Sequence, residues 1–372
     1  MIKNKLTILS FITIAVIVTA SIFANLRAPQ SEKEKISFFP ELSKKIESVN
    51  YISIKGYGNS INLSRKNDVW GIDEFDFYPA LPDKVKSAVL GAADLKINAP
   101  KTALPRLYHR LGVEGPNVPD TDSLLLTLSD SDKNIIIEVV VGKPRLSSSA
   151  ENISGLYVRR PEDEKSYLVD GVLDISATKT DWINRNLFDI PIEAVKLVNV
   201  VHADGDEFEL YKSEKGQERF EMKNLPIGKE LASELIVNRF GTILQDLQIS
   251  GARSKKDFIV SSAMGSDANE TTKIKIETFE GIVANVTAFK HEGLHFASFE
   301  FLYNEQIVAT ENQQGGENAN NADIQTYVDK LNYDTAGWWF EIPEFKYDII
   351  KRRSNTITRD IQNILPLKEK TQ

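Results

Sequence analysis

Cysteine is absent from all 372 residues of the chain. Disulfide bonds are therefore excluded, and so is attachment to a membrane as a lipoprotein through an N-terminal cysteine. The stability of the protein has to come from the burial of apolar side chains. Hydrophobic residues make up 41% of the sequence and charged residues 26%, which is the composition of a globular protein. The length suffices for one large core or two ordinary ones, and we expect two.

Histidine is scarce, and the chain holds only His109, His202, His291 and His295. A catalytic triad would have to use one of these four without any cysteine, and no G-x-S-x-G elbow is present. The segment Gly56-Tyr57-Gly58 lacks the third glycine of a dinucleotide site, and no P-loop occurs. We therefore predict no enzymatic activity, no catalytic residue and no cofactor.

Basic residues are fewer than acidic ones, 45 against 53, and the formal net charge is −8 at pH 7. Lys3, Lys5 and Arg27 precede the first acidic residue, Glu32, so the remainder of the chain is more acidic still. Nonspecific binding to nucleic acid requires Lys and Arg that neutralise phosphates. We expect no nucleic-acid partner.

Long apolar runs are missing except at the N-terminus. Uncharged residues continue without a break from Leu6 to Leu26, directly after Lys3 and Lys5. About 20 mostly apolar residues are enough to cross the hydrocarbon core of a bilayer as one helix. Basic residues tend to stay on the cytoplasmic side, so the long C-terminal part is the part that is translocated. We predict that residues 1–28 form a transmembrane signal anchor, with residues 6–26 in the lipid bilayer.

A cleaved signal peptide is the alternative for the same segment, and small residues before the cut are its mark. Val18-Thr19-Ala20 has them but lies inside the apolar run, whereas Ile22-Phe23-Ala24 places a bulky Ile where a small residue is preferred. The sequence favours an uncleaved anchor and leaves the signal peptide open.

The sequence pattern of the rest of the chain predicts two copies of one α+β unit. Residues 29–48 follow the anchor, and their polar, Pro-marked start at 28–35 is typical of a linker. We expect an α+β repeat over residues 49–188, a second over residues 189–353, and a C-terminal tail over residues 354–372. The predicted fold is a transmembrane helix followed by two tandem duplicated modules of antiparallel sheet plus helix.

Each repeat opens with alternating apolar residues that predict a three-strand meander. The first strands are 49–54 and 195–200, and each meander leads through a Leu-Pro pair, Leu81-Pro82 or Leu225-Pro226, into a segment of helical period. In the second repeat this period predicts one continuous amphipathic helix. Its apolar stripe is Leu231, Leu235, Ile236, Phe240, Ile243, Leu244 and Leu247.

Two long strands in a hairpin follow in each repeat, over 123–142 and 272–289, and then the segments 155–158 and 293–296, which align with each other. Each repeat is expected to close with tryptophan in a short helical or irregular segment, at Trp182 and at Trp338-Trp339. We interpret these rings as core anchors. An exposed aromatic platform for a sugar or peptide is the alternative.

Several short motifs resemble the bacterial domain-of-unknown-function 4340 family, over roughly residues 49–351. They are Leu111-Gly112-Val113, Val141-Gly142-Lys143, the segment 155–159, Tyr167-Leu168-Val169 and Asp181-Trp182. The resemblance implies a single-pass protein of the bacterial inner membrane with its C-terminal domain in the periplasm. Such proteins often look like accessories of ABC-type transport systems, including those related to gliding-motility auxiliary proteins. The resemblance implies no known reaction, and the Asn/Gly-rich insertion 313–321 departs from the family pattern.

His291-Glu292-Gly293-Leu294-His295 matches the H-E-x-x-H signature of zinc metalloproteases. That signature acts on a helix, where residues four apart hold one metal and the Glu activates the bound water. Here the flanking residues 282–289 and 294–301 alternate at strand spacing, so the His-Glu-Gly triplet predicts a hairpin turn. In an extended chain the two imidazoles would stand about 13 Å apart, so we predict no metal site.

Other charged groups have ordinary explanations. The pairs Asp120/Asp122, Asp130/Asp132 and Asp204/Asp206 lie between predicted strands, where Asp commonly stabilises turns. The basic residues Lys346, Lys351, Arg352, Arg353 and Arg359 fit a solvated terminal helix. The alternative is that they dock on acidic headgroups or on an acidic partner.

These observations predict a non-catalytic accessory subunit of an ABC-type transport or cell-envelope system. Its expected partners are an ABC-type permease or other inner-membrane envelope proteins. A periplasmic module that binds a polymer or peptide, in the groove between the repeats and on the tryptophans, is the second hypothesis. A membrane-tethered zinc protease using His291, Glu292 and His295 is the third.

Overall fold

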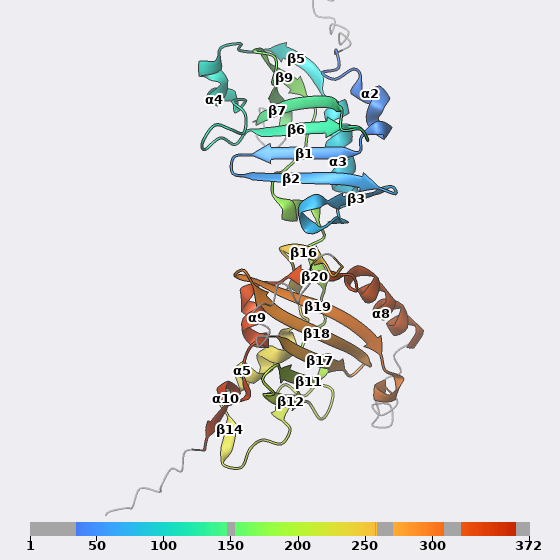
Figure 1. The fold of residues 1–372 in the computed structure, drawn as a ribbon, viewed down its shortest axis with the longest axis vertical. Helices are drawn as coiled ribbons and strands as arrows, with labels where there is room; N and C mark the ends of the chain where they lie inside the picture. Colours follow the sequence, from blue (N-terminus) through green and yellow to red (C-terminus); the bar gives the residue numbers. More distant parts are fainter. Residues whose placement is uncertain (1–34, 147–152, 257, 259–270, 309–320, 362–372) are drawn as a thin grey trace, which may run out of the picture.

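Antiparallel strands dominate the molecule. The computed structural model describes residues 35–146, 153–256, 258, 271–308 and 321–361. The predicted anchor at residues 6–26 lies outside these ranges, as does most of the insertion 313–321. Within the described ranges, no helix is both long and apolar enough to span a membrane. The strands form two large sheets, which follow one another along the long axis of the molecule (Figure 1).

The first sheet has nine strands in the order β4-β3-β2-β1-β6-β7-β8-β9-β5. Its strands are β1 (Tyr51–Gly56), β2 (Asn59–Lys66), β3 (Val69–Ile72), β4 (Tyr78–Pro79), β5 (Lys96–Pro100), β6 (Leu124–Ser129), β7 (Ile135–Leu146), β8 (Ile153–Arg159) and β9 (Ser166–Asp170). The helical elements of this unit are α2 (Leu42–Lys45), η1 (Ile46–Ser48), η2 (Asp73–Phe75), α3 (Pro82–Ala93), η3 (Pro105–Leu107), α4 (Tyr108–Leu111) and η4 (Lys179–Trp182).

The second sheet has eight strands in the order β13-β12-β11-β17-β18-β19-β20-β16. Its strands are β11 (Val195–His202), β12 (Glu207–Tyr211), β13 (Glu221–Met222), β16 (Gly251–Ser254), β17 (Thr272–Thr278), β18 (Ile282–His291), β19 (Leu294–Tyr303) and β20 (Trp338–Glu341). Its helical elements are α5 (Glu234–Asn238), η5 (Arg239–Thr242), α8 (Asn321–Thr335), α9 (Glu344–Ile350) and α10 (Ser354–Ile357). Two small ribbons pair β10 (Asn186–Phe188) with β15 (Leu247–Gln248) and β14 (Lys229–Leu231) with β21 (Thr358–Asp360).

The two sheets have the same strand order once β4 is set aside. Reading from the meander outward, β3-β2-β1-β6-β7-β8-β9-β5 corresponds position by position to β13-β12-β11-β17-β18-β19-β20-β16. The chain order corresponds as well, since each meander is followed by a helical segment and an edge strand before the long hairpin. The α+β class with antiparallel sheets is therefore as predicted.

Local sequence explains many of these elements. In β1, Ile52 and Ile54 are buried while their neighbours are less so, as alternation on a one-sided sheet requires. Helix α3 begins with Pro82 in its first turn, where the missing N–H costs nothing. Its buried residues Val85, Ala88, Val89 and Ala92 recur at helical spacing and join the main core.

The linker prediction is wrong for residues 35–48, which fold as part of the first unit. Phe38 and Leu42 are completely buried. Ser37 forms a bridge to Lys96 of β5, and the guanidinium of Arg160 lies 4.1 Å from the centre of the Phe38 ring. Composition did not predict this because residues 28–35 are polar, and the aromatic pair Phe38-Phe39 comes only after them.

Two further boundaries shift. Strand β10 falls in the predicted first repeat, yet it pairs with β15, and Phe188 packs its ring edge-on against Phe299 and Phe301 of the second unit. The predicted tail is wrong for residues 354–361, because α10 and β21 are part of the fold and β21 pairs with β14.

The predicted continuous helix of the second repeat is also wrong. Leu231 belongs to β14, only residues 234–242 are helical, and Leu247 begins β15. Leu235 is 70% exposed, so the stripe does not face one core. Its apolar residues are instead divided between a strand, a short helix and a turn, which hydrophobic period alone does not distinguish.

The predicted tryptophan closure is correct in the first unit and wrong in the second. Trp182 ends η4 and is fully buried, but Trp338 and Trp339 lie in strand β20, which pairs with β19 and β16. Strand β20 therefore occupies the position of β9, and not that of η4.

Candidate functional site: a groove between the two sheets

The edge of the first sheet at β4 meets the edge of the second sheet at β16. Asp76, which has a positive φ of 52°, accepts hydrogen bonds from Arg253 Nε at 2.8 Å and from the Ser254 amide at 3.0 Å. The ring of Tyr78 packs edge-on against Trp338, with 4.9 Å between ring centres. Burial, followed by the nearby charge of Asp334, raises the pKa of Tyr78 to about 12. The phenol at the junction therefore stays protonated at every physiological pH.

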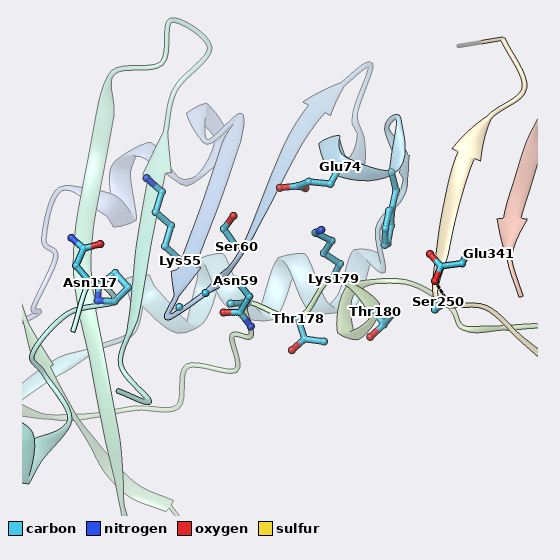
Figure 2. Close-up of a pocket in the computed structure, with 15 residues that line it drawn as sticks. Lys55, Asn59, Ser60, Glu74, Asn117, Thr178, Lys179, Thr180, Ser250 and Glu341 are labelled. Atoms are coloured by element: carbon cyan, nitrogen blue, oxygen red, sulfur yellow. Dashed lines mark hydrogen bonds between the residues drawn. The ribbon is translucent and has the colours of Figure 1, made fainter. Parts of the chain in front are cut away.

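A groove of about 730 Å³ opens beside this junction. Both units contribute to its walls, as Figure 2 shows. The first unit supplies the β1–β2 turn, η2, the loop at 116–117 and the segment 177–180, and the second unit supplies Ser250 and Glu341. Its side chains include Lys55, Asn59, Ser60, Glu74, Phe75, Asn117, Thr178, Lys179, Thr180, Ser250 and Glu341.

The two carboxylates of the groove are held in place. Glu74 accepts hydrogen bonds from the Asn62 backbone amide, at 3.1 and 3.2 Å, and from the Asn62 side chain at 2.9 Å. Ser250 Oγ donates to Glu341 Oε1 at 2.8 Å (Figure 2). A carboxylate fixed by local donors serves as a positioned acceptor, and its remaining lone pairs stay available to a ligand.

The donors of the groove complement these acceptors. Among the described residues, neither Lys55 nor Lys179 forms an ion pair with a carboxylate. Amides at Asn59 and Asn117 and the hydroxyl of Thr178 add uncharged donors and acceptors. Such a lining suits an extended polar chain, whose own donors and acceptors alternate.

Sequence reasoning anticipated a groove between the repeats but found none of its lining residues. Gly56-Tyr57-Gly58 lacks the third glycine of a dinucleotide site, and the structure places it instead at the β1–β2 turn in the wall of the groove. The tryptophans expected there are elsewhere. Trp182 is buried and donates from Nε1 to the Ser176 carbonyl at 2.9 Å, and Trp338 packs on Tyr78.

The H-E-x-x-H match lies on a tight hairpin, so the predicted turn is confirmed. Strands β18 and β19 pair Lys290 with His295 and His291 with Leu294. Glu292 and Gly293 form the two-residue turn, and both have positive φ, 49° and 81°, as a type I′ turn requires. Paired residues share a face and adjacent residues alternate. His291 and His295 therefore occupy opposite faces of the hairpin.

Their surroundings agree with this geometry. The ring of His291 packs edge-on against Phe258, with 5.4 Å between centres, whereas His295 stacks on Tyr347 at 4.6 Å. Burial, and then the charge of Lys290, lowers the pKa of His295.

Because one zinc ion needs both imidazoles at about 2 Å, we expect purified protein to contain no stoichiometric zinc. We expect Glu292→Gln to leave folding and partner binding unchanged. Metal analysis by mass spectrometry tests the first point, with His291→Ala as the matched variant. One zinc per chain that disappears in His291→Ala would overturn this assignment.

Neither of the two remaining histidines lines the groove. His109 is exposed on α4. His202 is buried at the end of β11, where Nδ1 is 2.9 Å from Thr272 Oγ1 and Nε2 is 2.9 Å from the Arg352 carbonyl. Burial lowers the pKa of His202. The structure thus gives His202 a packing role with both ring nitrogens satisfied.

The aspartate pairs form turns, as predicted. Asp130 Oδ1 accepts from the amides of Asp132 and Asn134, both at 2.9 Å. These hydrogen bonds, with that from the Asn134 side chain as the largest contribution, lower the pKa of Asp130. Asp204 Oδ1 accepts from the Asp206 amide at 3.2 Å. Asp120 lies in a turn with a positive φ of 58°.

The C-terminal basic residues are not one solvated helix. Lys346 is buried and donates to the carbonyls of Thr242 and Gln245. Three of the other four basic residues pair with carboxylates along different elements. These ion pairs are Lys351–Asp348, Arg353–Asp204 and Arg359–Glu230. Lys346, Arg353 and Arg359 hold the C-terminal segment to the rest of the second unit, which the sequence could not show because their partners lie 104, 149 and 129 positions away.

Comparison with known families agrees with the motif resemblance. A family model described as a domain of unknown function (DUF4340) matches residues 70–275, more than half of the chain. The chain belongs to the DUF4340 family. The matched region begins in β3 and ends in β17, so it includes the junction strands β4 and β16 and the parts of the groove at Glu74, Asn117, Thr178 and Ser250. No curated protein matches the chain, and no solved structure does.

Proposed function

We propose that this member of the DUF4340 family is a membrane-tethered accessory subunit of an ABC-type transport or cell-envelope system. It would stand in the bacterial inner membrane with its folded part in the periplasm, and act through contacts without catalysis. The observation that carries the proposal is the groove at the junction, because both sheets are needed to build it. Its fixed acceptors, and its two lysines that form no ion pair within the part of the chain that the structure describes, suit a polar segment of a partner protein in extended conformation.

The N-terminal sequence supports the tethered form of this proposal. The uncharged stretch from Leu6 to Leu26 follows two lysines, which is the pattern of an anchor with the folded part outside. A tether places the groove beside whatever membrane complex the protein serves. It also raises the effective concentration of the groove to about millimolar, so a modest contact suffices.

We further propose that the two sheets are copies of one duplicated unit. Their shared strand order supports this, as does the shared sequence of meander, helical segment, edge strand and hairpin. Duplication explains how a groove arises between units, since the free edge of one copy at β4 can receive the edge of the next copy at β16.

A substitution in the groove tests the accessory role. Thr178→Arg places a bulky charge in the lining, and we expect it to reduce recovery of the membrane partner at least several-fold. The measurement is crosslinked pulldown from native membranes, followed by quantitative mass spectrometry. Thr326→Arg, the same change on the exposed surface of α8, is the matched control and should leave recovery unchanged. Equal recovery from both variants would show that the groove is not the contact site.

A periplasmic module that binds an envelope polymer or a free peptide is the second candidate. The polar lining of the groove favours it, because hydroxyls and amides also suit a glycan. The same pulldown separates the two candidates. A stoichiometric permease supports the accessory subunit, whereas envelope polymer alone supports the binding module.

A further inference from the structure

A basic strip runs along the end of the first unit at which the described chain begins, with Lys35. Between Lys96 in β5 and Arg110 in α4 the sequence contains no Asp or Glu. Lys96, Lys101, Arg106 and Arg110 are exposed, and none forms an ion pair or hydrogen bond with a carboxylate of the described residues. In a chain with a net charge of −8, a cationic stretch of this length is a local exception.

Exposed apolar side chains accompany the charges. Leu104, between Lys101 and Arg106, is 48% exposed, and Ile36, beside β5, is 72% exposed. The Ile97 amide donates to the Ile36 carbonyl at 2.8 Å, which joins this residue to the strip. Basic and apolar side chains together on one exposed surface are the composition of segments that lie in a membrane interface.

Lys35 and Ser37, which are among the first described residues of the chain, lie beside the strip. Ser37 bridges to Lys96, and Lys35 Nζ lies 2.6 Å from Asp170 of β9. Asp170 also accepts from Asn98 at 2.7 Å, so the carboxylate nearest the start of the strip is already occupied. Figure 1 places β5 and α4 at the opposite end of the molecule from β14.

Chain length limits how far this end can stand from a membrane. Eight residues separate Leu26, the end of the apolar stretch, from Lys35. Whatever their conformation, they span at most about 30 Å. We propose that the strip from Lys96 to Arg110 is a docking surface for anionic phospholipid headgroups, which orients the elongated molecule with its second sheet away from the bilayer. This inference rests on the proposed anchor.

Neighbouring acidic residues bound the strip. Glu162, Asp163 and Glu164 lie in the turn between β8 and β9, and Tyr108 of α4 donates a hydrogen bond to the Glu164 carbonyl. Asp94 lies two residues before Lys96, the first residue of β5. The docking surface is therefore a defined stripe and not the whole end of the unit, and its attraction to lipid falls with salt because exposed charges are screened.

The absence of cysteine provides clean probes. Full-length protein is reconstituted into vesicles of phosphatidylcholine with phosphatidylglycerol, carrying a fluorophore on Leu104→Cys or, as the distal control, on Ile227→Cys. Ile227 is fully exposed and lies just before β14. We expect lipids with nitroxide headgroups to quench the Leu104 label several-fold more than the Ile227 label. The difference should shrink at high salt and in vesicles of phosphatidylcholine alone.

Charge variants complete the test. Changing Lys96, Lys101, Arg106 and Arg110 to Gln should reduce quenching at Leu104 to the level of uncharged vesicles. Changing Arg239, Lys256, Lys273 and Lys330, all exposed in the second unit, to Gln removes the same charge and should have no effect. Equal quenching of the two labels, or quenching that survives the first set of changes, would overturn the docking surface.

Carbonate extraction of the same vesicles tests the anchor separately from the docking surface. Protein that resists extraction but shows no quenching at Leu104 keeps its anchor and has no docking surface. Protein that carbonate removes has no anchor, and the orientation argued from residues 26–35 then fails with it.

Discussion

Trp182→Ala is expected to destabilise the first unit by about 3–5 kcal/mol, the usual cost of deleting a fully buried aromatic side chain. The indole is 0% exposed, and its ring packs within the main core. Its Nε1 donates to the Ser176 carbonyl at 2.9 Å, and its own carbonyl accepts from the Leu81 amide at 2.7 Å. Truncation therefore opens a cavity and removes the donor of the part-buried Ser176 carbonyl, while the backbone hydrogen bond to Leu81 loses its packing support.

Urea unfolding of the protein in detergent measures this effect, with the first unit followed separately if the two units unfold in separate steps. Trp182→Phe keeps most of the ring volume and should cost clearly less than Trp182→Ala. Trp338→Ala should also cost less, because Trp338 is only half buried and packs on Tyr78 at the junction. A urea unfolding curve for Trp182→Ala that matches the wild-type curve would contradict the buried position of the ring.

Replacing Leu6–Leu26 by a cleavable signal sequence is expected to weaken capture of the membrane partner roughly a hundredfold. We expect the released domain to keep its fold, so that the loss reflects only the lower effective concentration of the groove. Crosslinked pulldown at matched protein levels measures the change. An unrelated apolar helix of equal length in place of residues 6–26 is the control and should restore capture.

Full capture by the released domain would refute the tethered subunit and favour a freely diffusing binding protein. N-terminal sequencing of the wild-type protein adds an independent check. A mature chain that begins near Ser21 or Asn25 would establish the signal peptide that Val18-Thr19-Ala20 and Ile22-Phe23-Ala24 leave open.

Features that depend on neighbours in sequence could be predicted from the sequence. Alternation of apolar residues revealed strands such as β1 and β18, because it reports which face of a sheet is buried. Alternation on both sides of His291-Glu292-Gly293 predicted the β18–β19 hairpin. Turn chemistry predicted the Asp130 turn, because its hydrogen bonds involve residues within four positions. Repetition of this local pattern also predicted two units of one α+β class.

Features that depend on distant residues required the tertiary structure. Lys55 and Glu341 line one groove because the β4 edge of one sheet receives the β16 edge of the other, and no local pattern encodes that approach. Phe38 lies in the core although it was predicted to belong to a linker, and Arg353 pairs with Asp204. Both contacts join residues far apart in the sequence, so no local pattern encodes them either. Local backbone preference acts within a few residues, whereas burial and ion pairing act through space. The sequence by itself therefore determined the strands and turns that local alternation and turn residues specify, such as β1, β18 and the Asp130 turn. Packing decided which side chains meet, and it also divided the apolar stripe of the second unit between β14, α5 and β15.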